Sequence, residues 1–163
     1  FNRQPGVADK IFAEKIDRFF TSVFRHKQWV GKEDKPSNDG SSFGVSIIKG
    51  LEVENPPGEP LMSDEEKAVF IEAFGKGGFT GPINWYRNIT RNWEISADLP
   101  QKINVPCGQI YGTYDLVPAG GDVSEYVPDL EIVTFECGHW IQQEKVEETN
   151  AFLIDWLKRN APA

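Results

Sequence analysis

The sequence predicts an α/β fold in which a helical front half is followed by a short parallel sheet. In residues 6–25 the apolar side chains recur at the spacing of an amphipathic helix. After about Pro100 the pattern changes to two short apolar runs, which alternate with a turn-rich connection and a further helix. The order strand, connection, strand and helix is typical of an α/β sheet, and the predicted class follows from it.

The front half contains three segments with helical patterns. Pro5-Gly6 marks the start of the first, which spans residues 6–25. Ser63 opens the second, where Glu66 lies three residues further on and completes a capping box. The third, residues 80–96, is rich in aromatic side chains that we expect to pack together. The expected buried stripe of the second helix is Val69, Phe70, Ala73 and Phe74.

The back half contains two apolar runs and a closing helix. Residues 103–112 and 130–136 are short and largely apolar, and the second run is rich in β-branched residues, so we expect two buried strands of a parallel sheet. Residues 146–159 follow as an amphipathic helix. Its expected apolar face is Phe152, Leu153, Trp156 and Leu157.

The composition disfavours several classes of partner and site. The net charge is −8 without a basic stripe, so we expect no nucleic acid or membrane partner. No apolar run approaches the roughly 20 residues of a membrane span, and no secretory leader is expected. Cys107 and Cys137 form neither a CxxC pair nor a cluster with histidines, which disfavours a metal site and favours a reducing, cytoplasmic setting. The start at Phe1 predicts a cleaved or truncated product.

Two polar residues follow the two predicted strands. Asp115 comes after the first strand and His139 after the second. The carboxyl ends of parallel strands share one edge of the sheet, where ligands bind, so the two side chains are candidates for an orienting acid and a general base. A surface aspartate and a packed histidine without contact are the alternative that position leaves open. Asp122 is the second candidate for the acid.

A nucleophile for this base is harder to find in the sequence. Residues 40–44, GSSFG, match the G-x-S-x-G pattern with Ser42 at its centre. A nucleophile elbow needs a buried strand before the serine, whereas the preceding residues are charged and turn-forming. We therefore interpret the match as accidental, and no other strand-borne nucleophile is present.

Three segments resemble the soluble epoxide hydrolase branch of the α/β-hydrolase superfamily. They are GFTGPINWYRNITRNW, YGTYDLVP and ECGHW, and NWYRN at residues 84–88 is the most specific. The resemblance implies a helical cap over residues 1–98 and the closing part of the α/β-hydrolase core, its last parallel strands and helices, over 99–163. It also implies that the HGxP-type loop, the nucleophilic aspartate and a second cap tyrosine lie outside this sequence. The expected partner is the N-terminal half of the same fold as a separate chain.

The resemblance implies a reaction and a role for each candidate residue. An aspartate of the other chain attacks an epoxide carbon and forms an alkyl-enzyme ester. Tyr86 donates to the epoxide oxygen, and His139, oriented by Asp115, activates the water that cleaves the ester. Trp140, Leu116 and Val117 line the pocket for a small apolar epoxide. The scheme needs no metal or organic cofactor.

The sequence leaves other readings open. A haloalkane or fluoroacetate dehalogenase shares the GHW segment, but Tyr86 disfavours it. A serine esterase and a non-catalytic binding module or inert fragment are further alternatives. The identity and enantiomer of the epoxide also stay open, as does the oligomeric state, for which a homodimer of the assembled enzyme is one candidate.

Overall fold

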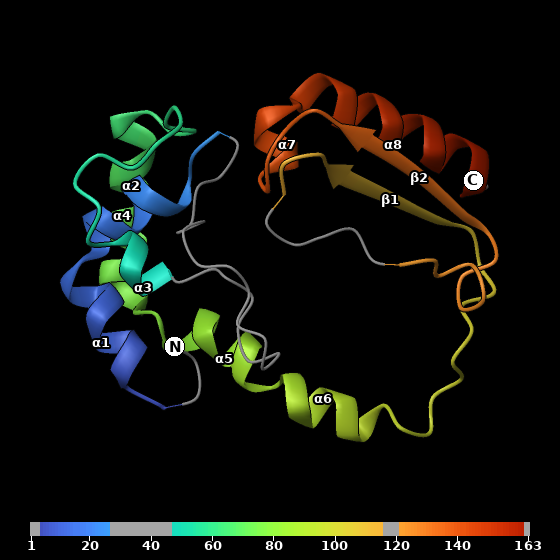
Figure 1. Ribbon diagram of the computed structural model, residues 1–163, viewed down its shortest axis with the longest axis horizontal. Helices are drawn as coiled ribbons and strands as arrows, with labels where there is room; N and C mark the ends of the chain where they lie inside the picture. Colours follow the sequence, from blue (N-terminus) through green and yellow to red (C-terminus); the bar gives the residue numbers. More distant parts are fainter. Residues whose placement is uncertain (1–3, 27–46, 116–120, 162–163) are drawn as a thin grey trace. The chain divides into compact units, whose positions relative to one another are not determined.

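The computed structural model describes residues 4–26, 47–115 and 121–161 (Figure 1). The chain divides into two compact units, and each is described here by itself. Unit 1 comprises residues 1–25 and 29–98, and unit 2 comprises residues 26–28 and 99–163. Within the described ranges unit 1 is helical, whereas unit 2 contains two strands and two helices. The turn-rich segment 31–44, which includes Ser42, lies outside the described residues.

Unit 1 begins with two helices where the sequence predicts one. Helix α1 spans Val7–Glu14 and α2 spans Ile16–Val23, and the chain bends between them at Lys15. The bend brings the Phe12 and Phe19 rings to a centroid distance of 5.0 Å, so that both helices contribute to one core. The expectation of a single helix is wrong here, because a helical spacing of apolar residues does not reveal a bend that tertiary packing imposes.

An aromatic core holds unit 1 together. Phe12 and Phe20 are buried with Phe79, and the Phe79 ring lies 4.9 Å from Phe19 and 5.0 Å from Phe74 in centroid distance. Edge-to-face and tilted aromatic contacts at these distances add to the free energy gained by burial of the rings. The short α3, Ile47–Gly50, closes this core through the buried Leu51 that follows it.

Helix α4, Asp64–Gly77, confirms the predicted capping box but not the predicted buried stripe. Ser63 Oγ accepts from the Glu66 backbone N–H at 3.2 Å, and a Glu66 side-chain oxygen accepts from the Ser63 N–H at 2.8 Å. Phe74 is half-buried, while Val69, Phe70 and Ala73 are exposed. The spacing identifies an apolar face correctly, but a face is buried only where other parts of the chain pack against it.

Helices α5, Thr80–Arg87, and α6, Ile89–Ile95, confirm the predicted helical character of residues 80–96. The expectation that their aromatic side chains pack together is wrong. Trp85 and Trp93 are about four-fifths exposed, at 78% and 77% of their accessible surface. The inner face of α5 is instead formed by the buried Ile83. A helical spacing does not say which side of an aromatic-rich helix faces the core.

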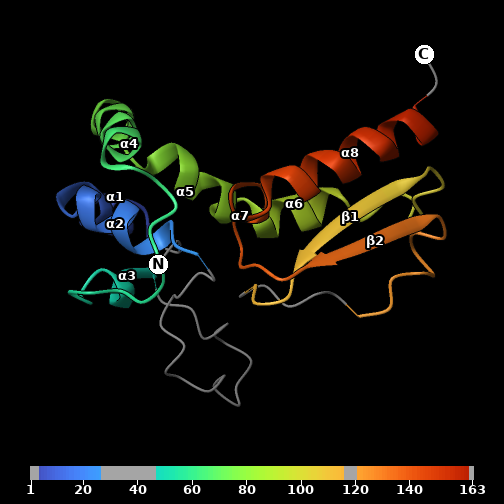
Figure 2. The same cartoon turned by 90° about the horizontal axis from the view of Figure 1, so that it is seen from above.

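Unit 2 contains the predicted parallel pair of strands (Figure 2). Strand β1, Cys107–Gly112, pairs with β2, Leu130–Phe135, and the register places Gly112 opposite Phe135. The strands were expected to be buried, but Ile132 is half-exposed and neither strand is fully covered along its length. The prediction of two parallel strands is confirmed and that of their burial is wrong, because burial of a strand depends on what packs against the faces of the sheet.

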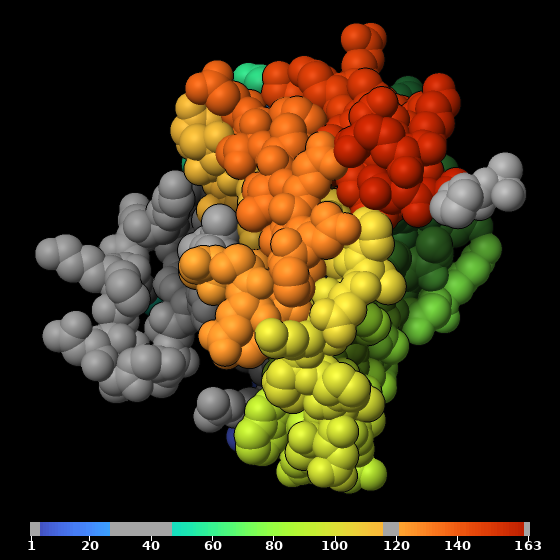
Figure 3. Space-filling model, turned by 90° about the vertical axis from the view of Figure 1, so that its right-hand side faces the viewer, coloured from blue at the N-terminus to red at the C-terminus, as the bar shows by residue number. Residues whose placement is uncertain are grey.

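Helix α8, Val146–Asn160, packs along the sheet after the short α7, Ile141–Glu144. The Trp156 ring lies against Gly108 of β1, so close that a Cβ on this glycine would be 3.0 Å from the indole nitrogen. In the space-filling view α8 and the residues of β2 form a continuous surface (Figure 3). Leu153 and Leu157, expected on the buried face of α8, are about half-exposed on this unit.

Candidate active site

The loops that follow the two strands of unit 2 are bonded to each other. The Thr113 backbone N–H donates to the Phe135 carbonyl, and the Tyr114 N–H donates to the Cys137 carbonyl, each at 2.9 Å. These bonds continue the pairing of β1 and β2 beyond the ends of the strands. The residues that come next on each loop are thereby held near one another at the carboxyl edge of the sheet.

A close backbone approach fixes the same two loops. A Cβ added to Gly112 would lie 2.2 Å from the Gly138 carbonyl oxygen and 2.8 Å from that of Cys137. Side chains do not occur at such distances from backbone atoms, so glycine is the residue that fits position 112. The absence of a side chain here lets the histidine-bearing loop lie directly over the end of β1.

Asp115 and His139 meet at this edge, as the sequence predicts. The His139 Nδ1 lies 2.8 Å from the Asp115 Oδ1. The aspartate side chain is 13% exposed and that of the histidine 40%. A proton on Nδ1 shared with the carboxylate leaves Nε2 as the acceptor of a neutral ring. The arrangement is therefore that of a half-exposed base whose ring is oriented by a nearly buried acid.

The alternative acid, Asp122, makes a different contact. Its Oδ1 accepts from the Ser124 backbone N–H at 2.9 Å, which is a local turn. The hydrogen bonds from Ser124 lower the pKa of the Asp122 carboxyl below its usual value. Of the two acids that the sequence proposed, Asp115 is the one that the structure places against His139.

Of the three residues expected to line the pocket, the structure describes Trp140. The Trp140 ring meets His139 edge-to-face, with a centroid distance of 5.3 Å and an interplanar angle of 77°. Leu116 and Val117 lie outside the described residues. Tyr86 lies on α5 of unit 1 and is 49% exposed, so it does not belong to the buried core of that unit.

Glu144 is a part of the site that the sequence analysis missed. Its side chain is only 4% exposed, and its Oε1 accepts from the Gly138 backbone N–H at 3.0 Å. This bond ties α7 to the residue that precedes His139. Cys137 is buried beside it, and burial, followed by the negative charge of Glu144, raises the pKa of the thiol. A glutamate in a charged segment carries no signal of burial in the sequence.

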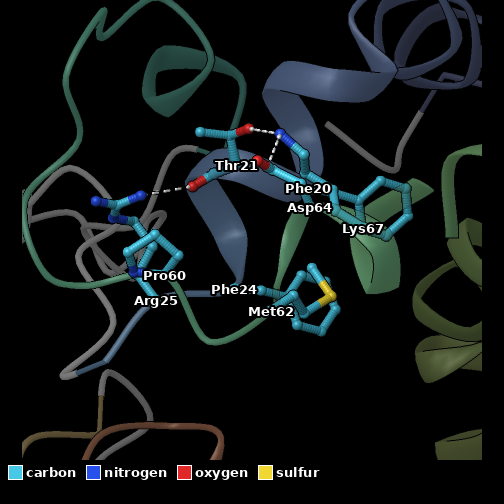
Figure 4. A pocket seen from close by; sticks show the side chains of 8 residues that line it. All are labelled: Phe20, Thr21, Phe24, Arg25, Pro60, Met62, Asp64 and Lys67. Carbon is cyan, nitrogen blue, oxygen red and sulfur yellow. Dashed lines mark hydrogen bonds and ion pairs between the residues drawn. The ribbon is translucent and has the colours of Figure 1, made fainter. Parts of the chain in front are cut away.

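No metal centre or membrane span is found in the described parts of the chain. No cluster of three His, Cys, Asp or Glu side chains there has the arrangement to hold a metal ion. Likewise, none of the helices described is both long enough and apolar enough to cross a bilayer. Unit 1 has a small pocket between α2 and α4 (Figure 4). Both cations that line it already have partners in the protein. Lys67 is paired with Asp17 and Asp64, and Arg25 donates to backbone carbonyls.

Comparison with known proteins finds the same kind of enzyme repeatedly. No family model matches the chain. Bifunctional epoxide hydrolase 2 of Rattus norvegicus is 36% identical over 161 residues, which are 96% of this chain and 28% of that protein. Epoxide hydrolase 1 of Siraitia grosvenorii is 37% identical over 170 residues, which are 96% of this chain and 51% of that protein.

Solved structures agree with this result. Epoxide hydrolase A from Mycobacterium thermoresistibile matches with a TM-score of 0.76 and 30% identity, over 96% of this chain and 50% of that one. Epoxide hydrolase I of potato, Solanum tuberosum, matches with a TM-score of 0.70 and 25% identity, over 97% and 51%. This chain spans about half the length, or less, of the relatives that it matches.

Proposed function

We propose that this chain, which belongs to the epoxide hydrolase family and has part of the α/β-hydrolase fold, supplies the base of an epoxide-hydrolysing site. The observation that carries the proposal is the 2.8 Å contact of His139 with Asp115 at the carboxyl ends of two parallel strands. A carboxylate in this position fixes the imidazole tautomer and stabilises the imidazolium that forms when Nε2 takes a proton.

The proposed reaction has two steps. An aspartate carboxylate of the nucleophile-bearing part of the fold attacks an epoxide carbon, the C–O bond breaks, and an alkyl-enzyme ester forms. His139 Nε2 then takes a proton from water, whose oxygen attacks the ester carbonyl and releases the vicinal diol. The carboxylate is regenerated. One proton of the water returns from His139 to the oxygen that leaves the ester, and the other replaces the proton that the epoxide oxygen took up, so no oxidant, reductant or cofactor is consumed.

Tyr86 is the proposed donor to the epoxide oxygen. Ring opening places negative charge on that oxygen, and a phenol positioned to donate a hydrogen bond or proton stabilises this charge. The side chain of Tyr86 is 49% exposed, while Ile83, one turn earlier on the same helix, is buried in the core. Unit 1 acts in this scheme as the cap and unit 2 as the closing part of the core, with Trp140 as an apolar wall for the substrate.

Isotope incorporation in a single turnover tests the ester route. The experiment uses the assembled protein, in which this chain is joined or bound to the nucleophile-bearing part of the fold. In H₂¹⁸O the first diol is expected to carry no label, because its new oxygen comes from the aspartate, and the label enters the protein instead. Labelled diol in the first turnover would mean direct attack by water and would sink the route. Repeated turnovers, which must give labelled diol, are the control.

Further measurements on the assembled protein distinguish the alternative functions and the number of chains. Denaturing intact-mass measurement of native protein is expected to reveal a second chain with the nucleophile, as the two-chain form requires. A single longer chain would overturn that form and leave the reaction unaffected. Halide release from a haloalkane without diol formation would point to a dehalogenase. Binding of an epoxide without turnover would point to a non-catalytic module.

A further inference from the structure

Helix α5 carries Tyr86, and three other side chains of this helix share one face. Thr80, Ile83 and Arg87 follow one another at spacings of three and four residues, which places them on one side of the helix. Ile83 is buried in the aromatic core of unit 1. The helix is only 8 residues long and has no side-chain cap at its N-terminus, so its position depends on tertiary contacts.

Asp9 of α1 contacts the end of this face through Arg87. Its Oδ2 lies 2.6 Å from an Arg87 guanidinium nitrogen, and its Oδ1 accepts from the second at 3.4 Å. Both terminal nitrogens of Arg87 therefore meet one carboxylate, each at a different oxygen. Such a two-pronged contact at the end of α5 restricts rotation of the helix about its axis.

The same carboxylate is tied to the start of α1. The Gly6 backbone N–H donates to Asp9 Oδ2 at 3.0 Å, and Gly6 is the residue that precedes α1. Arg87 and Asp9 are 15% and 12% exposed, which makes theirs the least exposed ion pair between described residues of unit 1. The guanidinium of Arg87, followed by the Thr80 hydrogen bond, holds the pKa of the Asp9 carboxyl well below its usual range.

We propose that Asp9 and Arg87 are positioning residues, which set the rotation of α5 and so the direction in which Tyr86 presents its hydroxyl group. This inference rests on the proposed function, in which Tyr86 donates to the epoxide oxygen. Tyr86 immediately precedes Arg87, so a rotation of α5 that loosens the ion pair moves the phenol as well. A donor displaced by about 1 Å loses much of its effect on the transition state.

A charge-conserving substitution tests the proposal in the assembled protein. Arg87→Lys keeps the positive charge but loses the two-pronged contact with the carboxylate. We expect alkyl-enzyme formation, followed by rapid quench and intact mass, to slow about tenfold, while hydrolysis of the ester is unchanged. Asp9→Asn, which keeps a side-chain oxygen acceptor, is the second variant and should act in the same direction.

Arg18→Lys is the matched control. Arg18 lies on α2 of the same unit and donates to the carbonyls of Leu51 and Glu54 at 3.4 and 3.0 Å, so this substitution breaks a comparable set of bonds away from α5. We expect it to lower the unfolding temperature without changing the rate of alkyl-enzyme formation. Slowing by Arg18→Lys as large as that by Arg87→Lys would overturn the proposal, because general loosening of unit 1 would then explain both.

A double substitution separates this inference from the proposed function. Tyr86→Phe alone must slow alkyl-enzyme formation, and an unchanged rate would sink the role of Tyr86 and the inference with it. If Tyr86→Phe slows the step and Arg87→Lys does not, the inference fails and the function stands. In the Tyr86→Phe background Arg87→Lys is expected to have no further effect within about twofold, since both act through one hydroxyl group. Additive slowing would overturn the positioning role.

Discussion

Unit 1 encloses a core of its own, whereas unit 2 leaves much of its apolar surface exposed. Among the described residues, nearly all of the fully buried apolar side chains belong to unit 1, and Cys137 is the exception. In unit 2 one strand and the long helix expose Ile132, Leu153, Ile154 and Leu157. A two-stranded sheet is at best marginally stable in water by itself, so the sheet of unit 2 depends on the helix that packs against it.

The two units hold their candidate functional residues in different ways. Unit 1 is held by its own aromatic contacts, and its candidate functional residue is a half-exposed side chain of a short helix. Unit 2 has its candidate residues on two loops that backbone hydrogen bonds fasten together, although the sheet below them is incomplete. The chain matches only about half of each solved relative, and the exposed faces of unit 2 are what a partial fold is expected to show.

The largest expected effect is on turnover by the base of unit 2, and a much smaller effect is expected on the stability of this unit. His139→Gln removes the base, so turnover should fall by at least about 10⁴-fold while the alkyl-enzyme ester accumulates. His139 bonds the nearly buried Asp115, and glutamine can still donate to that carboxylate, so the free energy of unfolding should fall by no more than about 1 kcal/mol. Quenched-flow mass spectrometry and thermal unfolding check both statements. Normal turnover by the variant would remove His139 from the mechanism.

A pair of matched substitutions sharpens the assignment of the acid. Asp115→Asn should lower turnover by about 10²- to 10⁴-fold, because the amide no longer stabilises the imidazolium or fixes its tautomer. Asp122→Asn is the control and should change turnover by less than about threefold, since Asp122 bonds to Ser124. Steady-state kinetics on both variants compares them. The reverse pattern would assign the role to Asp122.

Truncation in the aromatic core tests the self-sufficiency of unit 1. Phe20 is buried, and its ring stacks on Phe24 and meets Phe74 edge-to-face. Phe20→Ala should lower the free energy of unfolding by about 3 to 5 kcal/mol. Leu157→Ala on the exposed face of α8 should cost less than about 1 kcal/mol in the 163-residue chain. Denaturant titration of both variants gives the two values, and equal losses would contradict the comparison.

A smaller effect is expected at the start of α4. Ser63→Ala removes the side-chain acceptor of the Glu66 N–H and should destabilise unit 1 by about 1 kcal/mol. Ser63→Asp, which keeps an acceptor and adds a negative charge at the helix N-terminus, should restore most of this loss. Thermal unfolding of the two variants provides the measurement. A loss with aspartate as large as with alanine would argue against capping.

The smallest effect concerns acid stability. The pKa of Asp9 is lower in the folded protein than its unfolded value of about 3.9, so the unfolded state binds more protons in this range. The contribution of Asp9 is therefore complete above about pH 4 and is lost as the pH falls further. Asp9→Asn should flatten the fall of the unfolding temperature below about pH 4. An unchanged acid limb would mean that the ion pair contributes nothing there.

Local signals and strand topology could be read from the sequence. The capping box at Ser63 depends on two residues one turn apart, and it formed as expected. The proximity of Asp115 and His139 followed from the rule that parallel strands end at a common edge. In both cases the relevant contacts are determined by neighbours along the chain or by the direction of the strands.

The remaining features depend on contacts that no local pattern encodes. The bend at Lys15 follows from how two helices pack, and the exposure of Val69 or Leu157 depends on what else covers the face. Asp9 and Arg87 are separated by 78 residues, so no pattern in either segment predicts that they form an ion pair. Glu144 reads as a solvated charge in the sequence because burial is a property of the folded chain.

The register of the two strands gives the Asp115–His139 contact a second use. Gly112 is paired with Phe135, and a strand advances about 3.3 Å for each residue. A slip of β1 against β2 by one residue would therefore displace the carboxylate from the ring by more than a hydrogen bond tolerates. The downfield resonance that we expect for a His139 Nδ1 proton bonded to Asp115 would then be absent. That one NMR signal can report, during refolding, whether the sheet has paired in its native alignment.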